Sequence, residues 1–316
     1  SARWIAPTAT TVAEVLARLG LDARASESAI ADGRVFVGRK RVTRGLAEVP
    51  AGAEVLVHAP REEIALPQPF VLHEGDGLLA VDKPAGVPTV PDVTGARGTL
   101  IDLAARAIGR RREQLHPTSR LDRDVSGVVI FATTPAAADA LSRAREAGAY
   151  RRRYVAIAAG ELPDRVRWTW SIDRARDPRL RRAVDPPQGK ASATGARVVA
   201  RSSVGRSAFS LLSLAPETGR THQIRVHAAA AGAPLVGDRD YGGPARITAP
   251  TGKVIAVGRV ALHCAWVEVD LPARESVAER PRHCMIRVVS PVPRELAELA
   301  QALGLGSFEE AIACGP

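Results

Sequence analysis

The stretch that decides the fold is residues 116–132, HPTSRLDRDVSGVVIFA. Residues 128–132 are apolar and rich in β-branched side chains, and a Thr-Thr-Pro sequence follows them. This pattern predicts a short, fully buried β-strand. The charged loop SRLDRD precedes the strand, and its arginines favour the ionised form of Asp122. A solvated turn with surface ion pairs is the alternative interpretation of such a loop.

The overall charge points to a polyanionic partner. The chain has 316 residues and a formal net charge of +10. A basic surface speeds the encounter with nucleic acid and gains from counterion release, although many basic proteins never bind nucleic acid. Most of the positive charge is arginine, whose planar fork suits phosphates. A GC-rich bacterial genome explains the arginine bias equally well.

Cysteine usage and known binding motifs exclude several classes of protein. Three widely spaced cysteines, Cys264, Cys284 and Cys314, predict no disulfide framework and indicate a reducing compartment. The His-Cys pairs at 263–264 and 283–284 lack the spacing of a zinc site. No phosphate-binding or dinucleotide-binding glycine motif occurs, so no cofactor is expected. With no membrane-length apolar run and no signal pattern, we expect a soluble, cytoplasmic monomer.

Composition and periodicity suggest a small and a large domain. The predicted boundaries are a tail at 1–10, a small α+β module at 11–59, a linker at 60–69, a main domain at 70–293 and a C-terminal helix at 294–316. The main domain contains helical and strand patterns in alternation, and Thr134 with Pro135 is the expected start of a helix.

Several motifs resemble those of one enzyme family. Arg120-Leu121-Asp122 with Ser126-Gly127 resembles the HRLDxxTSG signature of the RluA-type pseudouridine synthases. The sequence TGRTHQIRVH at 218–227, continued by GD..YG at 237–242, is similar to a second family motif almost letter for letter. Weaker matches occur in the same order, namely KPAG at 83–86, the strand around Tyr154, GKASAT at 189–194 and LH at 262–263.

The resemblance implies a fold and a site. The fold would be α+β, with a mixed, antiparallel-rich central sheet and flanking helices. Asp122 would be the catalytic residue, Arg225 its ion-pair partner, and Tyr154 the ring that stacks on the target base. Core packing is the alternative role for Tyr154. Ile224 would form an apolar floor.

The same resemblance implies further substrate-binding residues. Arg120 would fill the space that the flipped base leaves in the RNA, and Arg220, His222 and Gln223 would bind substrate. Lys83 would contact a backbone phosphate, with a plain proline turn as the equal alternative.

The N-terminal module resembles the α-L RNA-binding module found in ribosomal proteins and RNA-modifying enzymes. Its RNA-facing residues would be Arg24, Arg34, Arg39 and Arg41. An appendage without RNA contact is the alternative. The implied partner is RNA, ribosomal RNA being favoured slightly over transfer RNA, which is also a family substrate.

Two departures from the family pattern bear on activity. Ser119 stands where the family has histidine, and Val125 where it has threonine. A catalytically inactive RNA-binding relative with the same fold is therefore the competing hypothesis. A hydrolase that uses Asp122 and Asp124 as a carboxylate pair is a weaker one, because such pairs need a defined separation across a sugar.

Overall fold

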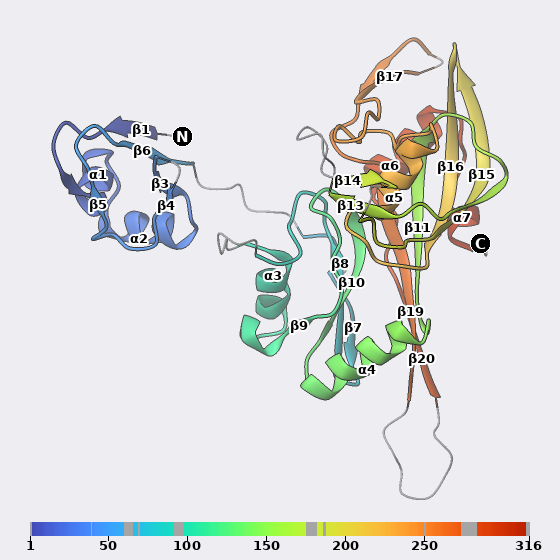
Figure 1. The fold of residues 1–316 in the computed structure, drawn as a ribbon, viewed down its shortest axis with the longest axis horizontal. Coiled ribbons are helices and arrows are strands. Elements are labelled where there is room, and N and C mark those ends of the chain that lie inside the picture. The colour runs from blue at the N-terminus through green and yellow to red at the C-terminus, as the bar shows by residue number, and fades with distance from the viewer. Residues whose placement is uncertain are drawn as a thin grey trace, which may run out of the picture. The chain divides into compact units, whose positions relative to one another are not determined.

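The structure is a computed structural model of the chain. It describes residues 2–38, 40–59, 66–68, 70–91, 98–174, 182–185, 188–249, 251–272 and 283–313. Internal contacts divide the chain into two compact units, residues 1–66 with 89–109 and residues 67–88 with 110–316. Figure 1 shows the elements of both units, coloured along the chain. Within the described ranges, none of the helices has the length and apolar character needed to span a membrane.

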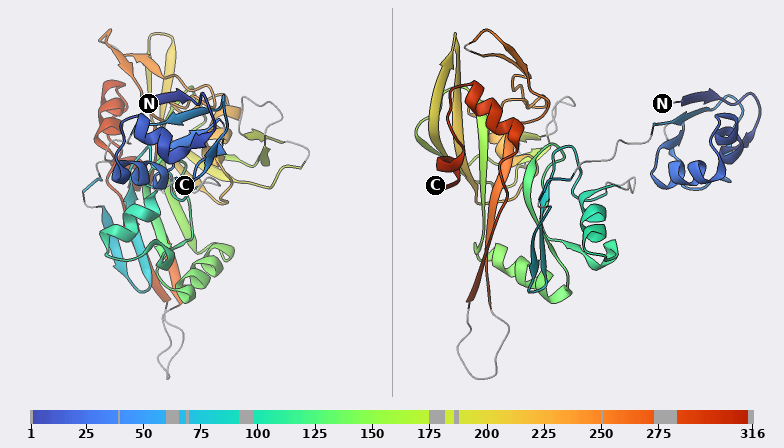
Figure 2. Two further views of the ribbon diagram at one scale, coloured as in Figure 1. Left: turned by 90° about the vertical axis from the view of Figure 1, so that its left-hand side faces the viewer. Right: turned by 180° about the vertical axis from the view of Figure 1, so that it is seen from behind.

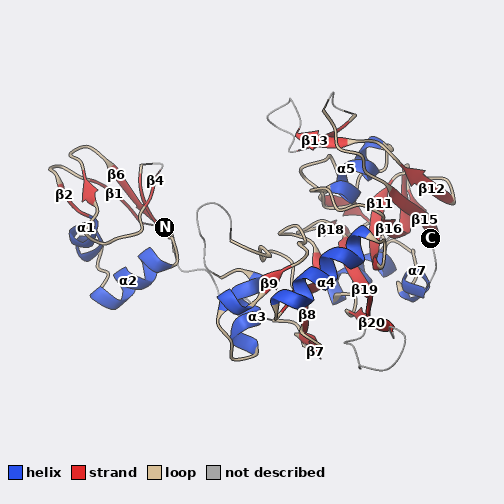
Figure 3. Ribbon diagram, turned by 60° about the horizontal axis from the view of Figure 1, so that its bottom comes forward, coloured by secondary structure: helices blue, strands red, loops and turns tan. Residues whose placement is uncertain are grey.

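The first unit contains a small four-stranded sheet and three helices. The sheet has the order β1 (Ala2–Ile5), β6 (Glu54–Val57), β3 (Val35–Val37) and β4 (Lys40–Arg41), and β2 (Thr10–Thr11) pairs with β5 (Glu48–Val49). The helices are α1 (Val12–Arg18), α2 (Ala23–Ala31) and α3 (Leu100–Ala107). Figure 3 separates these helices from the strands by colour.

The N-terminal module forms by local capping and a compact apolar core. Thr11 and Glu14 form a capping box at the start of α1, whose Val12, Val15 and Leu16 are buried. α2 begins at Ala23, because the Asp22 carboxylate accepts a hydrogen bond from the Ala25 amide at 2.7 Å.

The prediction of a loose tail at residues 1–10 is wrong for residues 2–5. These residues form β1 and pair antiparallel with β6. Ala2 and Trp4 also pack against the apolar core of the module, so both hydrogen bonding and burial hold this strand in place.

A ten-stranded sheet organises the second unit. Its main order is β12 (Arg165–Trp168), β15 (Thr194–Val204), β16 (Ser207–Pro216), β11 (Tyr150–Ala159), β19 (Leu262–Pro272), β10 (Ser126–Ala132), β8 (Leu78–Lys83) and β7 (Val71–Gly75). β20 (His283–Val289) pairs with β19, and β9 (His116–Pro117) pairs with β10. All these pairings are antiparallel except that of β10 with β19, which confirms the predicted mixed, antiparallel-rich sheet.

The predicted buried strand, β10, lies at the centre of this sheet. All seven of its residues are buried, as the apolar sequence predicts, and it begins two residues earlier than expected, at Ser126. At Gly127 the backbone of β19 comes so close that a Cβ atom would lie 2.2 Å from the Cys264 carbonyl oxygen. Gly127 also has a φ of 116°, so this position requires glycine.

Helices and short hairpins surround the sheet. α4 (Pro135–Glu146) begins as predicted, with the Thr134 hydroxyl accepting a hydrogen bond from the Ala137 amide at 3.2 Å, and it buries Leu141 and Ala144 in the main core. The remaining elements are the 3₁₀ turn at Arg112–Gln114, α5 (Gln223–Ala230), and the hairpins of β13 (Ile172–Arg174) with β14 (Arg182–Val184) and of β17 (Arg246–Thr248) with β18 (Val254–Ala256).

The C-terminal segment is more than the single surface helix that its sequence predicts. It forms α6 (Arg294–Ala302) and α7 (Glu309–Ala313), which lie against the upper part of the sheet in Figure 2. Leu296, Leu299 and Phe308 are buried in a core shared with strands β11 and β16. Helical spacing explains the burial of Leu296 and Leu299, which lie on one apolar face of α6.

Candidate active site

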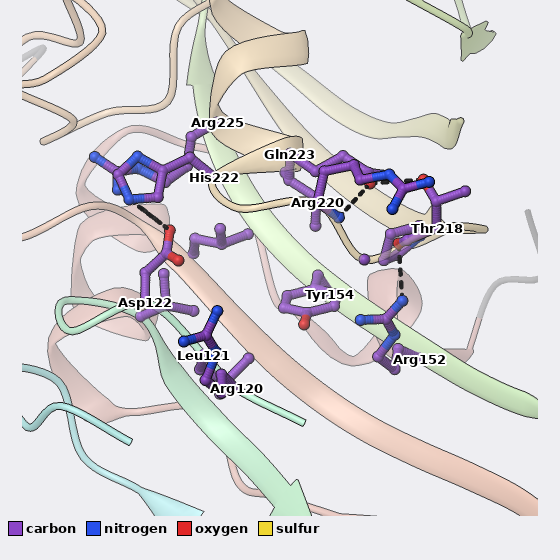
Figure 4. Close-up of a pocket in the computed structure, with 15 residues that line it drawn as sticks. Arg120, Leu121, Asp122, Arg152, Tyr154, Thr218, Arg220, His222, Gln223 and Arg225 are labelled. Carbon is purple, nitrogen blue, oxygen red and sulfur yellow. Dashed lines mark hydrogen bonds and ion pairs between the residues drawn. The ribbon is translucent and has the colours of Figure 1, made fainter. Parts of the chain in front are cut away.

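The loop that carries Asp122 joins β9 to β10 and lines a pocket. The Asp122 side chain is 24% exposed, and the Val125 amide donates to the Asp122 carbonyl at 3.2 Å to close the turn. Figure 4 shows this pocket, with Asp122 and Tyr154 on facing walls. Eight of the nine predicted site residues line it, namely Arg120, Asp122, Tyr154, Arg220, His222, Gln223, Ile224 and Arg225.

Arg225 forms the predicted ion pair with Asp122. Its Nη1 lies 3.2 Å from Asp122 Oδ2, although the two residues are 103 positions apart in the chain. Arg225 is on the first turn of α5, and only 9% of its side chain is exposed. Such burial strengthens the attraction between guanidinium and carboxylate, because water screens it less.

Two further carboxylates hold Arg225 in place. Asp238 accepts hydrogen bonds from Nε at 2.7 Å and from Nη2 at 2.6 Å, and Asp240 accepts from Nη2 at 2.8 Å. Burial alone would lower the pKa of Arg225, but the bonds to Asp238, then Asp240 and Asp122, outweigh it and raise the pKa. The guanidinium therefore stays charged and fixed in orientation.

His222 and Tyr241 complete this side of the pocket. His222 is the N-cap residue of α5, in a left-handed conformation with a φ of 59°. Its Nδ1 lies 2.8 Å from the Tyr241 hydroxyl, and its Nε2 lies 3.9 Å from Asp122 Oδ2. The Tyr241 ring packs under the Arg225 guanidinium at 5.0 Å. Left-handed backbone in a non-glycine residue costs about 1–3 kcal/mol and is common at functional sites.

Tyr154 and Ile224 form the apolar part of the pocket. Both are about as buried as core residues, at 6% exposure each. A β-bulge between Arg153 and Tyr154 changes the register of β11 against β19 at this position. The extra residue is Ala265 on β19, so the alternation of side chains along β11 continues, and the Tyr154 ring faces the pocket. Burial raises the pKa of the Tyr154 hydroxyl, so the ring remains neutral.

Lys83 does not occupy the predicted phosphate-binding position. It is fully buried, and its Nζ donates to the carbonyl oxygens of Pro84 at 2.9 Å, Arg123 at 2.8 Å and Val125 at 2.7 Å. These bonds use all three ammonium hydrogens, so none is left for a phosphate. The prediction of a substrate contact is wrong, because Lys83 instead holds the backbone on both sides of Asp124.

Gln223 lines the pocket, but its amide is not free to bind substrate. Its Oε1 accepts from the Thr218 hydroxyl at 2.7 Å and the Arg220 amide at 3.0 Å. Its Nε2 donates to the Ala193 carbonyl at 2.8 Å and the Thr194 hydroxyl at 2.9 Å. The predicted binding role is therefore corrected to a structural one, since Gln223 ties α5 to β15.

Arg120 and Arg220 lie exposed at the pocket, as their predicted contact with substrate requires. The Arg220 Nε donates to the Ala191 carbonyl at 3.1 Å. Arg152 also lines the pocket and was not predicted. The sequence could have indicated this position of Arg152, because it lies two residues before Tyr154 on the same strand and alternate strand residues share a face.

Asp238, Asp240 and Tyr241 were also missed as site residues. They lie in the GD..YG motif, within a loop that needs two glycines. A Cβ at Gly237 would lie 2.0 Å from the Arg259 carbonyl oxygen, and one at Gly243 would lie 1.8 Å from that of Leu235. These close backbone approaches fix the path of the loop and therefore the directions of the Asp238 and Asp240 side chains.

A buried polar network lies behind the Asp122 loop. Ser290 Oγ donates to Asp82 Oδ1 at 2.8 Å, and His263 lies between Ser290 and Ser126, at 3.3 Å and 2.9 Å. Burial lowers the pKa of His263 to about 3, so it is neutral. Burial also raises the pKa of Asp82 to about 6, against the opposing hydrogen bond from Ser290.

The histidines and cysteines do not form a metal site in the described ranges. There, no group of three or more metal-ligating side chains occurs. His227 is buried and contacts the hydroxyls of Thr194 and Ser192, each at 3.1 Å, and the Trp170 carbonyl at 3.0 Å. Cys314 lies outside the described residues.

The basic residues predicted for the N-terminal module differ in exposure. Arg24 is exposed, whereas only 11% of the Arg34 side chain is. Arg34 binds the Asp32 carboxylate at 3.3 Å and the His58 carbonyl at 3.2 Å, so its predicted RNA-facing position is wrong. Arg41 is half-buried beside Gly33, and Arg39 lies outside the described residues.

Comparisons with known proteins agree with this geometry. Residues 77–230 match the model of the RNA pseudouridylate synthase family. An uncharacterised RNA pseudouridine synthase of Bacillus subtilis, YhcT, is 37% identical over 216 residues, covering 67% of this chain and 68% of the relative. Ribosomal large subunit pseudouridine synthase D of Xanthomonas campestris is 35% identical over 289 residues, covering 88% and 82%.

A solved structure shares the fold. Human RNA pseudouridylate synthase domain containing 1 superposes with a TM-score of 0.55 at 23% identity, covering 75% of this chain and 95% of that one. The motifs, the sheet and the relatives all lead to one assignment. The chain belongs to the RNA pseudouridine synthase family and is an isomerase of that class.

Proposed function

We propose that this protein converts uridine to pseudouridine in large-subunit ribosomal RNA, with Asp122 as the catalytic carboxylate. The observation that carries the proposal is the 3.2 Å contact between Arg225 and Asp122 in a pocket walled by Tyr154 and Ile224. Relatives that are named ribosomal large subunit pseudouridine synthase D support the choice of RNA.

The reaction needs an ionised carboxylate beside the ribose and the base. The bond from ribose C1′ to uracil N1 breaks, the base turns, and a bond from C1′ to C5 forms. N1 gains a proton, and the hydrogen on C5 is lost. Proton acceptance and covalent attack both require Asp122 in its charged form. Arg225 supplies the fixed positive charge that such a form needs in a partly buried site.

The remaining pocket residues would bind the flipped nucleotide. Tyr154 would stack on the uracil ring, Ile224 would exclude water from below it, and Arg120 would occupy the gap left in the RNA. Flipping a nucleotide out of structured RNA costs about a few kcal/mol, which these contacts must offset.

The competing hypothesis of an inactive relative rests on Ser119 and Val125. Neither side chain is among the partners of the Asp122 carboxylate or of the Arg225 guanidinium in the described residues, although the Val125 backbone amide donates to the Asp122 carbonyl. Ser119 hydrogen-bonds to the Tyr150 hydroxyl at 3.3 Å, and Val125 is buried with 2% exposure. The hydrolase hypothesis receives no support, because Asp124 is not among the residues lining the pocket and 59% of its side chain is exposed.

The substrate is tested by tritium release from RNA labelled at uracil C5. Ribosomal RNA and transfer RNA from cells that lack this protein are compared as substrates. We expect release from large-subunit ribosomal RNA and none from transfer RNA. Release from transfer RNA alone would contradict the proposed substrate but keep the reaction.

A further inference from the structure

A second groove adjoins the pocket and shares one wall with it. The shared residues are Arg120, Arg152, Thr218, Gly219 and Arg220. The groove continues past them to Ser119, Tyr150 and Arg145, the last on α4. Figure 4 labels Arg120, Arg152 and Arg220, three of the shared residues. A chain that leaves the pocket on this side must therefore enter the groove.

Four arginines line the groove, and none of them forms an ion pair with a described carboxylate. Arg152 donates to the Thr218 carbonyl at 2.8 Å and Arg220 to the Ala191 carbonyl, which are neutral acceptors. Arg145 lies over the Tyr150 ring at 4.4 Å. Because carbonyl oxygens and an aromatic ring carry no net charge, they do not neutralise these guanidinium groups. The groove therefore attracts anions.

The two acidic residues of the groove do not cancel this charge. Both Glu217 oxygens accept from Arg167, at 2.7 Å and 2.6 Å, and Arg167 is not part of the lining. That hydrogen bond lowers the pKa of Glu217, despite partial burial. Glu146 is the one acid of the groove lining that has no arginine partner among the described residues. Positive charge therefore dominates the groove.

The groove suits a phosphate group better than a nucleobase. A base would need a free aromatic face, but Tyr150 is only 8% exposed, with Arg145 over its ring and Ser119 on its hydroxyl. Arg152 Nε and Arg145 Nη2 are buried and have no hydrogen-bond acceptor among the described residues, so a phosphate would be bound by the other nitrogens of these two guanidinium groups. Planar guanidinium forks match phosphate oxygens in geometry and charge.

We propose that this groove binds the phosphodiester backbone of the RNA strand next to the flipped nucleotide, through Arg145 and Arg152. The inference rests on the proposed function, because it takes RNA as the ligand of the adjoining pocket. It adds two phosphate-binding residues that lie outside the Asp122 and TGRTHQIRVH motifs.

The salt dependence of RNA binding tests the groove directly. The full chain, its Arg145→Gln variant and its Arg152→Gln variant are titrated with a short fluorescein-labelled oligouridylate at several KCl concentrations. Each variant should lower the affinity by about tenfold. It should also reduce the slope of log affinity against log salt by about 0.7, the value for one lost contact to a single strand.

Arg206→Gln is the matched control. Arg206 is exposed in the turn between β15 and β16, at the opposite end of β16 from the pocket, roughly 30 Å away by strand rise. The Arg206→Gln substitution removes the same positive charge, but at a distance from the groove that exceeds the electrostatic screening length of about 10 Å. Slopes for Arg145→Gln and Arg152→Gln that equal the Arg206→Gln slope would overturn the proposal.

Tritium release by the wild type, measured in parallel, separates the two proposals. Release together with unchanged slopes would refute the groove and keep the reaction. Reduced slopes without release would support the groove as an RNA site and contradict the proposed function. Arg145 lies outside the pocket, so its variant reports on the groove even if Arg152→Gln disturbs the pocket wall.

Discussion

Arg225 binds Asp122 through one nitrogen and Asp238 through two. The contact to Asp122 is 3.2 Å, and those to Asp238 are 2.7 Å and 2.6 Å. The bidentate pair with Asp238 is fully buried on the carboxylate side and sets the orientation of the guanidinium. The remaining nitrogen, Nη1, then points at Asp122. The position of the positive charge beside the proposed catalytic residue therefore depends on a carboxylate that is itself fully buried.

Arg225→Lys should lower kcat by about 100-fold or more, because one ammonium cannot bind Asp238 in two places and still reach Asp122. Steady-state kinetics on ribosomal RNA would measure the effect. A kcat within a few fold of wild type would show that a simple point charge is enough at this position.

Asp238→Asn should destabilise the protein by about 3–5 kcal/mol, since it leaves a buried guanidinium without its main partner. Asp240→Asn is the matched control. Its side chain is 40% exposed, and exposed pairs contribute only about 0–1 kcal/mol. Urea unfolding of both variants measures the difference, and equal losses would contradict the anchoring role of Asp238.

Lys83 makes stability depend on pH. Burial lowers its pKa from 10.5 to about 7, although the charges of Asp122 and Asp124 oppose this. The unfolded chain therefore binds one proton more than the folded chain between these pH values, and the contribution of Lys83 to stability rises with pH through this window. The rise amounts to a few kcal/mol.

The Lys83→Met variant isolates this effect. Subtracting its unfolding free energy from that of the wild type, from pH 6 to 10, should give a difference that increases with pH. A flat difference would show that Lys83 keeps an ordinary pKa. The variant should also lose about 1–3 kcal/mol or more, because three loop carbonyls lose their donor.

Gly127→Ala should unfold the protein or cost at least about 3 kcal/mol, because the new Cβ would collide with the Cys264 carbonyl in the centre of the sheet. Gly205→Ala is the control, since Gly205 also has a positive φ of 61° but has open space around it. Backbone strain alone costs about 1 kcal/mol. Similar thermal shifts for both variants would contradict the close approach of β10 and β19.

Local sequence patterns predicted much of this fold because their causes are local. The apolar run at 128–132 had to be buried, and Thr134 with Pro135 had to start a helix, whatever lay around them. The pocket was predicted from motifs, since Asp122 and Arg225 are 103 residues apart and no local pattern brings them together.

The errors in prediction come from contacts between distant segments. The sequence KPAG does not reveal that Lys83 faces the interior, where the Pro84 carbonyl and two carbonyls of a loop about 40 residues later, those of Arg123 and Val125, accept its hydrogens. The sequence motif suggests that the Gln223 amide binds substrate, because it does not show that Thr194 of β15 lies beside the amide and accepts its hydrogen bond. Likewise, β1 forms because β6 offers a free edge and the core of the module accepts Ala2 and Trp4.

The central claim is that Asp122 carries out the isomerisation. Its most direct test is tritium release from C5-labelled ribosomal RNA by the wild type and by Asp122→Asn, with RNA affinity measured on the same preparations. We predict release by the wild type only, with affinities within about threefold of each other, because Asp122→Asn removes one charge and leaves the four groove arginines in place. Release by Asp122→Asn at the wild-type rate would contradict the account.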